Sequence, residues 1–357
     1  MKLGFWTGII VLLGLPHALR AFPEMVRHGY LSCTTCHYSP NGGKILTPYG
    51  RSLSREVLST WGAEGEENIL HGLGSFTLPE SLQLGGDFRG LQVYRDTATA
   101  RDARFFLMQA EMAVAASLSD WVLVASIGYR PSSEQKKGKL ILPEHYLLYN
   151  VSPSVSVRLG KFARPYGLPL PDHYLSIKRR LGLERENELY HVQASYLGET
   201  FEVPLTATFG SLSFDEPDER GFTIRPAIHG ERTKAGFTYS LMKSDDKLSH
   251  TVGPWVMWAP TKKWLIAAEW DFQWSEERAA LKRFSVGLLR FNYEIFKGFN
   301  AQVWDEVDYH ANGNTVHRPA IGFQFYPRPH WEIQGSYAKE LDSRQFEQGL
   351  LLVHYYL

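Results

Sequence analysis

The sequence predicts an all-β fold, a transmembrane antiparallel β-barrel of about sixteen strands. Three observations favour it. From residue 81 onward, segments of about ten residues alternate apolar and polar side chains, without a convincing helical stretch between them. The connections between these segments alternate between short and long. The last segment runs to the final residue, as expected when a terminal strand closes a barrel.

The alternation is clearest between residues 264 and 275. Trp264, Trp270 and Trp274 fall on one face of the expected strand, and Glu269 and Asp271 on the other. A soluble sandwich would place such aromatic residues in its core, whereas a barrel places them in lipid and the acids in a wet lumen. Other residues expected to face lipid are Phe106, Met108, Ala110, Met112, Val114, Trp331, Ile333, Gly335 and Tyr337. Those expected to face the lumen include Gln109, Glu111, Glu332, Gln334 and one of Asp305 and Glu306.

The expected strands, with boundaries uncertain by two to four residues, are 81–94, 104–117, 121–130, 140–150, 154–163, 189–197, 201–210, 220–229, 234–243, 249–259, 263–274, 281–294, 299–309, 316–326, 330–339 and 345–357. Long connections are expected at 164–188, 211–219, 244–248 and 310–315. Short turns at one end and long loops at the other are typical of outer-membrane barrels, whose long loops are extracellular. The final strand ends on Leu357 after Tyr355 and Tyr356, where such barrels usually end on an aromatic residue.

The composition is compatible with this fold. The net charge is zero, and 21% of the residues are charged. Averaged hydropathy does not reveal a barrel, because its lipid-facing and lumen-facing residues alternate. Aromatic residues make up 13% of the chain and include ten tryptophans, which fits aromatic girdles at two membrane interfaces. No nucleic-acid partner is expected.

Residues 1–21 are expected to be a signal peptide. Lys2 lies in a short basic start, an apolar run extends from Ile9 to Leu15, and small residues stand at Ala18 and Ala21. The apolar run is shorter than the roughly 20 residues that a spanning helix needs. The mature chain would begin near Phe22.

Cys33-Thr34-Thr35-Cys36-His37 contains the only two cysteines of the chain, followed directly by a histidine. This spacing allows both thiols to form thioether bonds with one haem while the histidine ligates its iron. A disulfide or half of a zinc site are the alternatives, but no second cysteine pair is present to complete a zinc cluster. We expect one covalently attached c-type haem, with Cys33 and Cys36 as its attachment points and His37 as a ligand of its iron.

The haem would lie in residues 22–80, a segment with few apolar residues and irregular loops around Asn41-Gly42-Gly43. Such a short segment cannot easily bury a haem alone, and a sixteen-strand barrel leaves a lumen wide enough for a plug. The expected domains are therefore a monohaem segment at 22–80, at the periplasmic side of the barrel or inside its lumen, and the barrel at 81–357. His28, Met25, His71, a barrel side chain or an open position could complete the iron coordination, with His28 preferred to Met25.

The combination of a signal peptide, a single C-x-x-C-H, a stretch ending in Tyr49-Gly50-Arg51 and a barrel resembles the fused outer-membrane monohaem cytochrome-porin family. The specific resemblance covers about residues 22–60 and is architectural beyond them. It implies one haem held in a barrel so that electrons cross the bacterial outer membrane. The best-known members oxidise ferrous iron, and this barrel is shorter than those of the iron oxidases.

Three functions are compatible with these features. The first is electron transfer between an extracellular donor or acceptor, such as ferrous iron, and periplasmic c-type cytochromes. The second is a passive porin whose haem segment is a structural plug or gate, and the third is sensing or small-molecule chemistry at an open haem iron. The acidic run Asp215, Glu216, Asp218 and Glu219 could receive iron, and the basic run Lys178–Arg180 could meet lipopolysaccharide phosphates. Loop solubility explains both runs more simply.

Overall fold

The computed structural model describes residues 23–68, 78–130, 139–172, 174–183, 188–211, 219–277, 280–310, 313–341 and 346–357. The expected signal peptide, His71 and three acids of the acidic run, Asp215, Glu216 and Asp218, lie outside these residues. Among the described residues, none of the helices has the length and apolar character required to span a bilayer.

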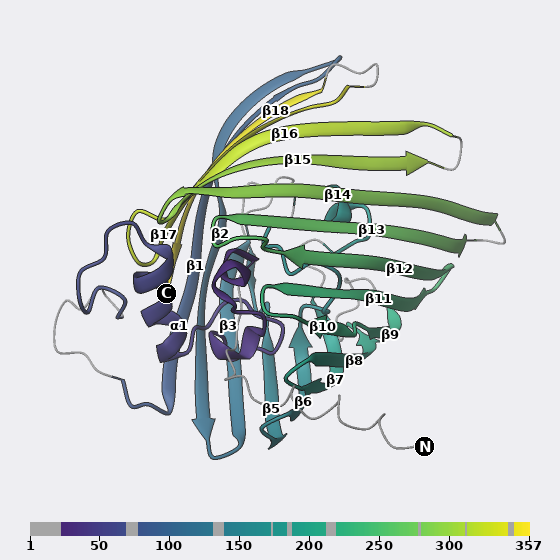
Figure 1. Cartoon of the computed structure of the whole chain (residues 1–357). Coiled ribbons are helices and arrows are strands. Elements are labelled where there is room, and N and C mark those ends of the chain that lie inside the picture. Colours follow the sequence, from purple (N-terminus) through teal and green to yellow (C-terminus); the bar gives the residue numbers. More distant parts are fainter. Residues whose placement is uncertain are drawn as a thin grey trace, which may run out of the picture.

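One antiparallel sheet contains all the strands, which wind around a common axis (Figure 1). Their bounds are β1 Leu82–Asp96, β2 Arg101–Leu118, β3 Trp121–Arg130, β4 Lys139–Ile141, β5 His145–Ser152, β6 Val155–Phe162, β7 Leu189–Leu197, β8 Phe201–Gly210, β9 Arg220–Ile224, β10 Ala227–His229, β11 Thr233–Ser244, β12 Lys247–Trp258, β13 Trp264–Glu277, β14 Ala280–Phe296, β15 Phe299–His310, β16 Thr315–Phe325, β17 Trp331–Lys339 and β18 Glu347–Tyr356.

The sheet closes into a barrel because β1 pairs with β2 on one side and with β18 on the other. Asp87 of β1 stands opposite Glu111 of β2 and opposite Tyr356 of β18. β4 and β5 both pair with β3, so together they form one interrupted strand of the ring. β9 and β10 both pair with β8 and with β11, and they form a second interrupted strand. Pro143 and Pro226 lie at the two interruptions, where a proline cannot donate to the ladder. The ring therefore has sixteen positions, as predicted.

The two ends of the barrel differ. The short-turn end carries the tight connections, such as Ser119–Asp120 and Lys297–Gly298, together with the start of β1 and the end of β18. β3, β6 and β8 end at the opposite, long-loop end, at Arg130, Phe162 and Gly210. The expected long connection at 244–248 is wrong, because β11 and β12 continue to Ser244 and Lys247 and are joined by a turn at Asp245–Asp246.

The predicted faces are confirmed for β13 and β17. Trp264, Trp270 and Trp274 are outward-facing and 37–41% exposed, while Glu269 and Asp271 are buried inside. Trp331 and Tyr337 also lie on the outer face, opposite the buried Glu332. Of the pair Asp305 and Glu306, Glu306 is the buried, inward residue.

Strand β2 departs from the prediction at one point. The register with β1 shifts between Arg89 and Gly90, which leaves Met108 as an extra residue between the pairs of Gln109 and Leu107. A β-bulge reverses which residues face inward beyond it. Met112 therefore lies outside as predicted, but Phe105 and Leu107 are the exposed residues above the bulge. The prediction that Phe106 and Met108 face lipid is wrong, since both line a cavity inside the barrel.

The N-terminal segment, residues 23–68, consists of short helices and loops. Its elements are a 3-10 helix η1 Pro23–His28, a 3-10 turn η2 Cys33–Thr35, the helix α1 Pro48–Leu53 and a π-helical turn η3 Ser54–Leu58. Thr47 caps α1, because its hydroxyl oxygen accepts from Gly50 N at 3.1 Å, and Pro48 follows at the first helical position. Figure 1 shows this purple segment against the inner side of the strands.

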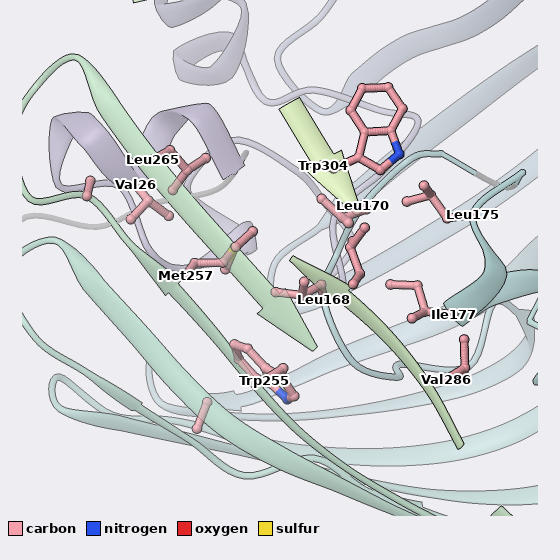
Figure 2. Packing of buried hydrophobic residues seen from close by; sticks show 14 of the residues in the cluster. Val26, Leu168, Leu170, Leu175, Ile177, Trp255, Met257, Leu265, Val286 and Trp304 are labelled. Atoms are coloured by element: carbon pink, nitrogen blue, oxygen red, sulfur yellow. The ribbon is translucent and has the colours of Figure 1, made fainter. Parts of the chain in front are cut away.

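The largest apolar cluster lies inside the barrel, where three parts of the chain meet (Figure 2). Val26 and Leu31 come from the N-terminal segment, and Leu168, Leu175 and Ile177 come from the connection between β6 and β7. The wall of the barrel contributes Trp255, Met257, Leu265, Val286, Leu288 and Trp304. Part of the lumen is therefore packed like a protein core rather than lined by polar groups alone.

Candidate functional site

Cys33, Cys36 and His37 lie on one tight turn. The amides of Cys36 and His37 both donate to the Cys33 carbonyl, at 3.2 and 2.9 Å. All three side chains are buried, with exposed fractions of 9% for Cys33, 2% for Cys36 and 5% for His37. Burial raises the pKa of the Cys33 thiol and lowers the pKa of His37 to about 4, so the imidazole is neutral at pH 7.

Two glycines fit closely around this turn. Gly42 has a φ of +80°, and a Cβ atom there would lie 3.4 Å from Cys33 Sγ and 3.9 Å from His37 Cδ2. Gly50 brings helix α1 against the turn, since a Cβ atom at this position would lie 2.4 Å from the Cys36 carbonyl oxygen. The Cys36 carbonyl also accepts from Thr47 N at 2.9 Å. The loop and helix after the motif therefore fix the shape of the turn.

The N-terminal segment is tied to one side of the barrel wall by buried basic residues. Arg27, 1% exposed, donates to Asn292 Oδ1 of β14 at 2.9 Å and to Asn300 Oδ1 of β15 at 2.8 Å. Lys234 of β11 donates to the Leu31 carbonyl at 2.8 Å. A buried donor that loses its acceptor leaves a costly unsatisfied group, so these bonds resist displacement of the segment.

Further contacts reach the opposite side of the ring. Lys44 Nζ lies 3.1 Å from Glu111 Oε2 of β2, and Ser39 Oγ accepts from Arg158 of β6 at 3.1 Å. Arg51 donates to the Leu84 carbonyl of β1, and the hydroxyls of Ser54 and Tyr356 of β18 lie 2.8 Å apart. Thus residues 27–54 contact strands all around the lumen near the short-turn end.

A cavity of about 350 Å³ opens beside the motif. Cys33, His37 and Leu46 line it from the N-terminal segment, Asp87 and Arg89 from β1, and Leu168 from the connection after β6. Cys36 lies behind this surface in an apolar cluster with Met25, Leu46, Leu53, Leu58 and Tyr326. One thiol and the imidazole therefore face the cavity, and the second thiol packs against residues of its wall.

A chain of polar residues borders the same cavity. His354 of β18 places Nε2 2.9 Å from Asp87 Oδ1 and Nδ1 2.7 Å from Glu332 Oε2. Both ring nitrogens of His354 thus lie within hydrogen-bond distance of a carboxylate oxygen. Asp87 also acts electrostatically on His37, which connects this charged group to the motif.

The connection after β6 folds into the lumen; its residues 163–183, with 173 not described, are called the inner loop. Leu168 N donates to Glu269 Oε2 of β13 at 2.8 Å, and Asp172 pairs with Arg290 of β14 at 2.6 Å. Ser176 Oγ accepts from Arg318 of β16 at 2.9 Å. Because β15 and β16 lie opposite β6 and β7 in the ring, the inner loop crosses the lumen.

The inner loop corrects one interpretation of the sequence. Lys178 was expected to face outward with Arg179 and Arg180, but it is 7% exposed and donates to the carbonyls of Tyr166 and Leu168, at 3.2 and 2.8 Å. Burial lowers its pKa. Arg179 and Arg180 are exposed, as the simpler interpretation predicts.

The structure separates the two described candidates for the second iron ligand. Met25, 1% exposed, packs in the same cluster as Cys36. His28, the last residue of the same 3-10 helix, is only partly buried, and burial together with the charge of Arg27 lowers its pKa. Glu219, the described member of the acidic run, lines the large cavity near Arg164.

Solved structures resemble this chain over most of its length. The loop-deleted outer membrane protein OmpT of Vibrio cholerae has a TM-score of 0.63 and 10% identity, covering 77% of this chain and 99% of its own. The outer membrane channel DcaP of Acinetobacter baumannii has a TM-score of 0.57 and 14% identity over 80% of this chain and 100% of its own. A refined porin has a TM-score of 0.56 and 13% identity over 77% and 100%.

The chain has the outer-membrane porin fold. The porins are matched over nearly their whole length, so about a fifth of this chain extends beyond the shared fold. A part of similar size, 81 of 357 residues, precedes β1. No family model matches the sequence, and no curated protein matches it.

Several residues of the site were not anticipated. The pairing of His354 with Asp87 joins residues 267 positions apart. Gly50 acts through its close approach to the Cys36 backbone, and Arg27 acts through hydrogen bonds to the side chains of Asn292 and Asn300. Such contacts can be found only when the register of the strands and the closure of the barrel are known.

Proposed function

We propose that this protein is an outer-membrane electron carrier that holds one c-type haem inside a porin-type barrel. Cys33 and Cys36 would attach the haem and His37 would ligate its iron. The observation that carries the proposal is the position of Cys33 and His37 on a lumen cavity, in a segment bonded to strands around the ring. The haem, when bound, supplies reversible one-electron transfer.

The residues around the motif suit this group. Two thiols and a neutral imidazole on one turn are the donors that attachment and ligation require. The side of the cavity next to Gly42 can accept a large planar group close to Cys33 Sγ, because no Cβ atom occupies that approach. Leu46 and Leu58 supply apolar surface, and the Asp87–His354–Glu332 group supplies fixed charge.

Met25 is favoured over His28 as the second ligand of the iron, which reverses the order expected from the sequence. Met25 belongs to the buried apolar cluster that contains Cys36, whereas the side chain of His28 is only partly buried. We expect Met25→Ala to change the optical spectrum from low spin to high spin and His28→Ala to leave it unchanged. The reverse result would assign the ligand to His28.

The barrel provides the path across the membrane. Its outer face carries exposed apolar and aromatic side chains, including Trp264, Phe272 and Trp331, and its backbone hydrogen bonds are satisfied within the ring. The short-turn end would face the periplasm and its c-type cytochromes, and the long-loop end the external donor or acceptor, such as ferrous iron. A haem within the lumen shortens the distance that electrons travel across about 30 Å of bilayer.

A passive porin with a structural N-terminal plug is the second candidate. It is favoured by the fold itself, which is shared with DcaP, described as an outer membrane channel. In this case solute would pass through the lumen without turnover of any haem. Cys33 and Cys36 would then be thiols or a disulfide.

The test is expression with a c-haem maturation system, followed by isolation of outer membranes. We expect a haem stain on denaturing gels and a reduced-minus-oxidised haem spectrum in wild type. Cys33→Ser/Cys36→Ser should abolish both, while Thr34→Ala/Thr35→Ala, which changes only the residues between the cysteines, should retain them. A wild-type barrel that inserts correctly without haem would reject the electron-carrier proposal and leave the passive porin.

The direction and donor are tested in intact cells. Ferrous iron supplied outside cells whose periplasm it cannot enter should reduce the haem rapidly. Solute flux without any haem reduction would contradict the proposed conduit.

A further inference from the structure

A second cavity, of about 200 Å³, lies on the long-loop side of the first. Its β1 residues, Leu91, Val93 and Arg95, are farther from the short-turn end than Asp87, which borders the first cavity. Pro171 and Tyr174 of the inner loop close one side. Arg89 lines both cavities and so stands between them.

The walls of this cavity combine polar side chains, such as Arg89, Arg95 and Gln348, with a large apolar surface, which is unusual for the inner face of a water-filled barrel. The bulge of β2 is one cause, because it turns Phe106 and Met108 inward. Leu91 and Val93 of β1 and Leu350 and Leu352 of β18 complete the surface. Bulges commonly redirect side chains beside functional sites.

Two hydrogen-bond donors on the cavity are unused. Trp304 is 3% exposed, and its Nε1 has no acceptor among the residues the structure describes. The same holds, within the described ranges, for Nε of Arg89, whose ion pair with Asp87 is a long 3.7 Å contact. Buried donors without acceptors are rare and costly, so their presence on a cavity points to an acceptor supplied by a ligand. Figure 2 shows the Trp304 indole beside Leu170 and Leu175 of the inner loop.

The acids on the cavity are already engaged. Asp172 pairs with Arg290 at 2.6 Å, and Glu332 accepts from His354 at 2.7 Å and from Gln324 at 2.6 Å. The donors of Arg89 and Trp304 therefore still lack a hydrogen-bond acceptor, and an anionic acceptor would suit the Arg89 guanidinium best. The rest of the ligand must match the apolar wall.

We propose that this cavity binds a small aromatic carboxylate, with its ring against Phe106, Met108 and Leu350 and its carboxylate facing the Trp304 indole and the Arg89 guanidinium. This is a solute site inside the barrel, separate from the cysteine motif. No residue of the cysteine motif lines this cavity, so its occupancy can be measured with and without haem.

The test is calorimetric titration with 2-naphthoate of the detergent-solubilised full chain, prepared with and without c-haem maturation. We expect saturable binding of 2-naphthoate and none of acetate, which lacks the apolar body. Trp304→Phe keeps the ring but removes the N–H and should weaken binding roughly tenfold or more. Trp255→Phe is the matched control, because the Trp255 indole is also 3% exposed and lacks an acceptor among the described residues but does not line this cavity.

Three results would overturn the proposal: no saturable binding of 2-naphthoate, equal weakening by Trp304→Phe and Trp255→Phe, or binding to haem-free protein alone. The last result would mean that the two donors serve a carboxylate of the haem itself. If Trp304→Phe does not fold, Leu350→Trp replaces it. This change fills the cavity and should abolish binding.

Discussion

Single residues determine how the turn that carries Cys33, Cys36 and His37 is held. The sequence identifies Cys33, Cys36 and His37 by spacing, but the turn depends equally on Gly50, which allows helix α1 to touch the Cys36 carbonyl. Thr47 begins that helix and also donates to the Thr35 carbonyl, at 3.0 Å. One helix start thus supports the residue directly before Cys36.

Gly50→Ala should loosen this turn. Its added Cβ would stand 2.4 Å from a backbone oxygen that cannot rotate away, a clash of the kind that costs about 1–3 kcal/mol. We expect trypsin to cleave within residues 23–68 roughly tenfold faster, and haem incorporation to fall. Ser52→Ala, in the same helix, is the control and should leave the cleavage rate unchanged. Equal rates for Gly50→Ala and wild type would show that the helix can move at no cost.

The motif can be proposed from the sequence alone because the chemistry expected of it depends on residues adjacent in sequence. The sequence cannot choose between Met25 and His28, since both are compatible ligands a few residues upstream. Their burial distinguishes them, because Met25 is 1% exposed in the cluster of Cys36 and His28 is only partly buried. Sequence patterns carry no such information.

At the scale of elements, the inner loop is the least expected feature. The sequence predicts a long connection after β6, and its length alone gives no reason for it to enter the lumen. Its inward course is secured by hydrogen bonds from its backbone and side chains to β13, β14 and β16. Gly167 has a φ of +54°, and a Cβ atom there would overlap a carboxylate oxygen of Glu269.

Gly167→Ala should therefore push the inner loop away from β13. We expect a larger single-channel conductance in planar bilayers, because the loop obstructs the lumen where it crosses. Gly313→Ala is the control, since Gly313 has a similar φ of +86° but open space around it. If both variants conduct like wild type, the inner loop does not limit the passage of ions.

The strands themselves were largely predictable, because the alternation of inward and outward side chains follows from consecutive residues in the sequence. The bulge at Met108 was missed for the same reason: Phe106 and Met108 continue the apolar alternation of β2, and only the pairing with β1 reveals the extra residue. One inserted residue exchanges the two faces without any change in composition.

At the scale of the whole molecule, the N-terminal segment and the barrel form one packed body. Arg27 bonds to β14 and β15, while Lys44 reaches β2 on the other side. A closed barrel with a lumen was predictable from the number of strands. These individual contacts were not, because they join parts of the chain separated by up to 273 positions.

Cutting the contacts on both sides should free the segment. The double variant Arg27→Met/Lys44→Met leaves Asn292, Asn300 and Glu111 without these partners, so we expect its ion conductance to rise well above that of wild type. Lys282→Met is the control, because the pair of Lys282 with Glu277 is exposed and contributes little. A double variant that conducts like wild type would show that these contacts do not keep the segment in the lumen.

The hydrogen bond between Ser54 and Tyr356 also constrains the order of assembly. Ser54 belongs to the part of the chain that is synthesised and exported first, and Tyr356 is the penultimate residue. The segment can reach its final position only after the last strand has met β1, and closing so long a loop is slow. If a cofactor is joined to Cys33 and Cys36 during export, the N-terminal segment that carries it therefore lies outside the lumen until the barrel closes. Attachment must then precede membrane insertion, or else occur through the short-turn opening.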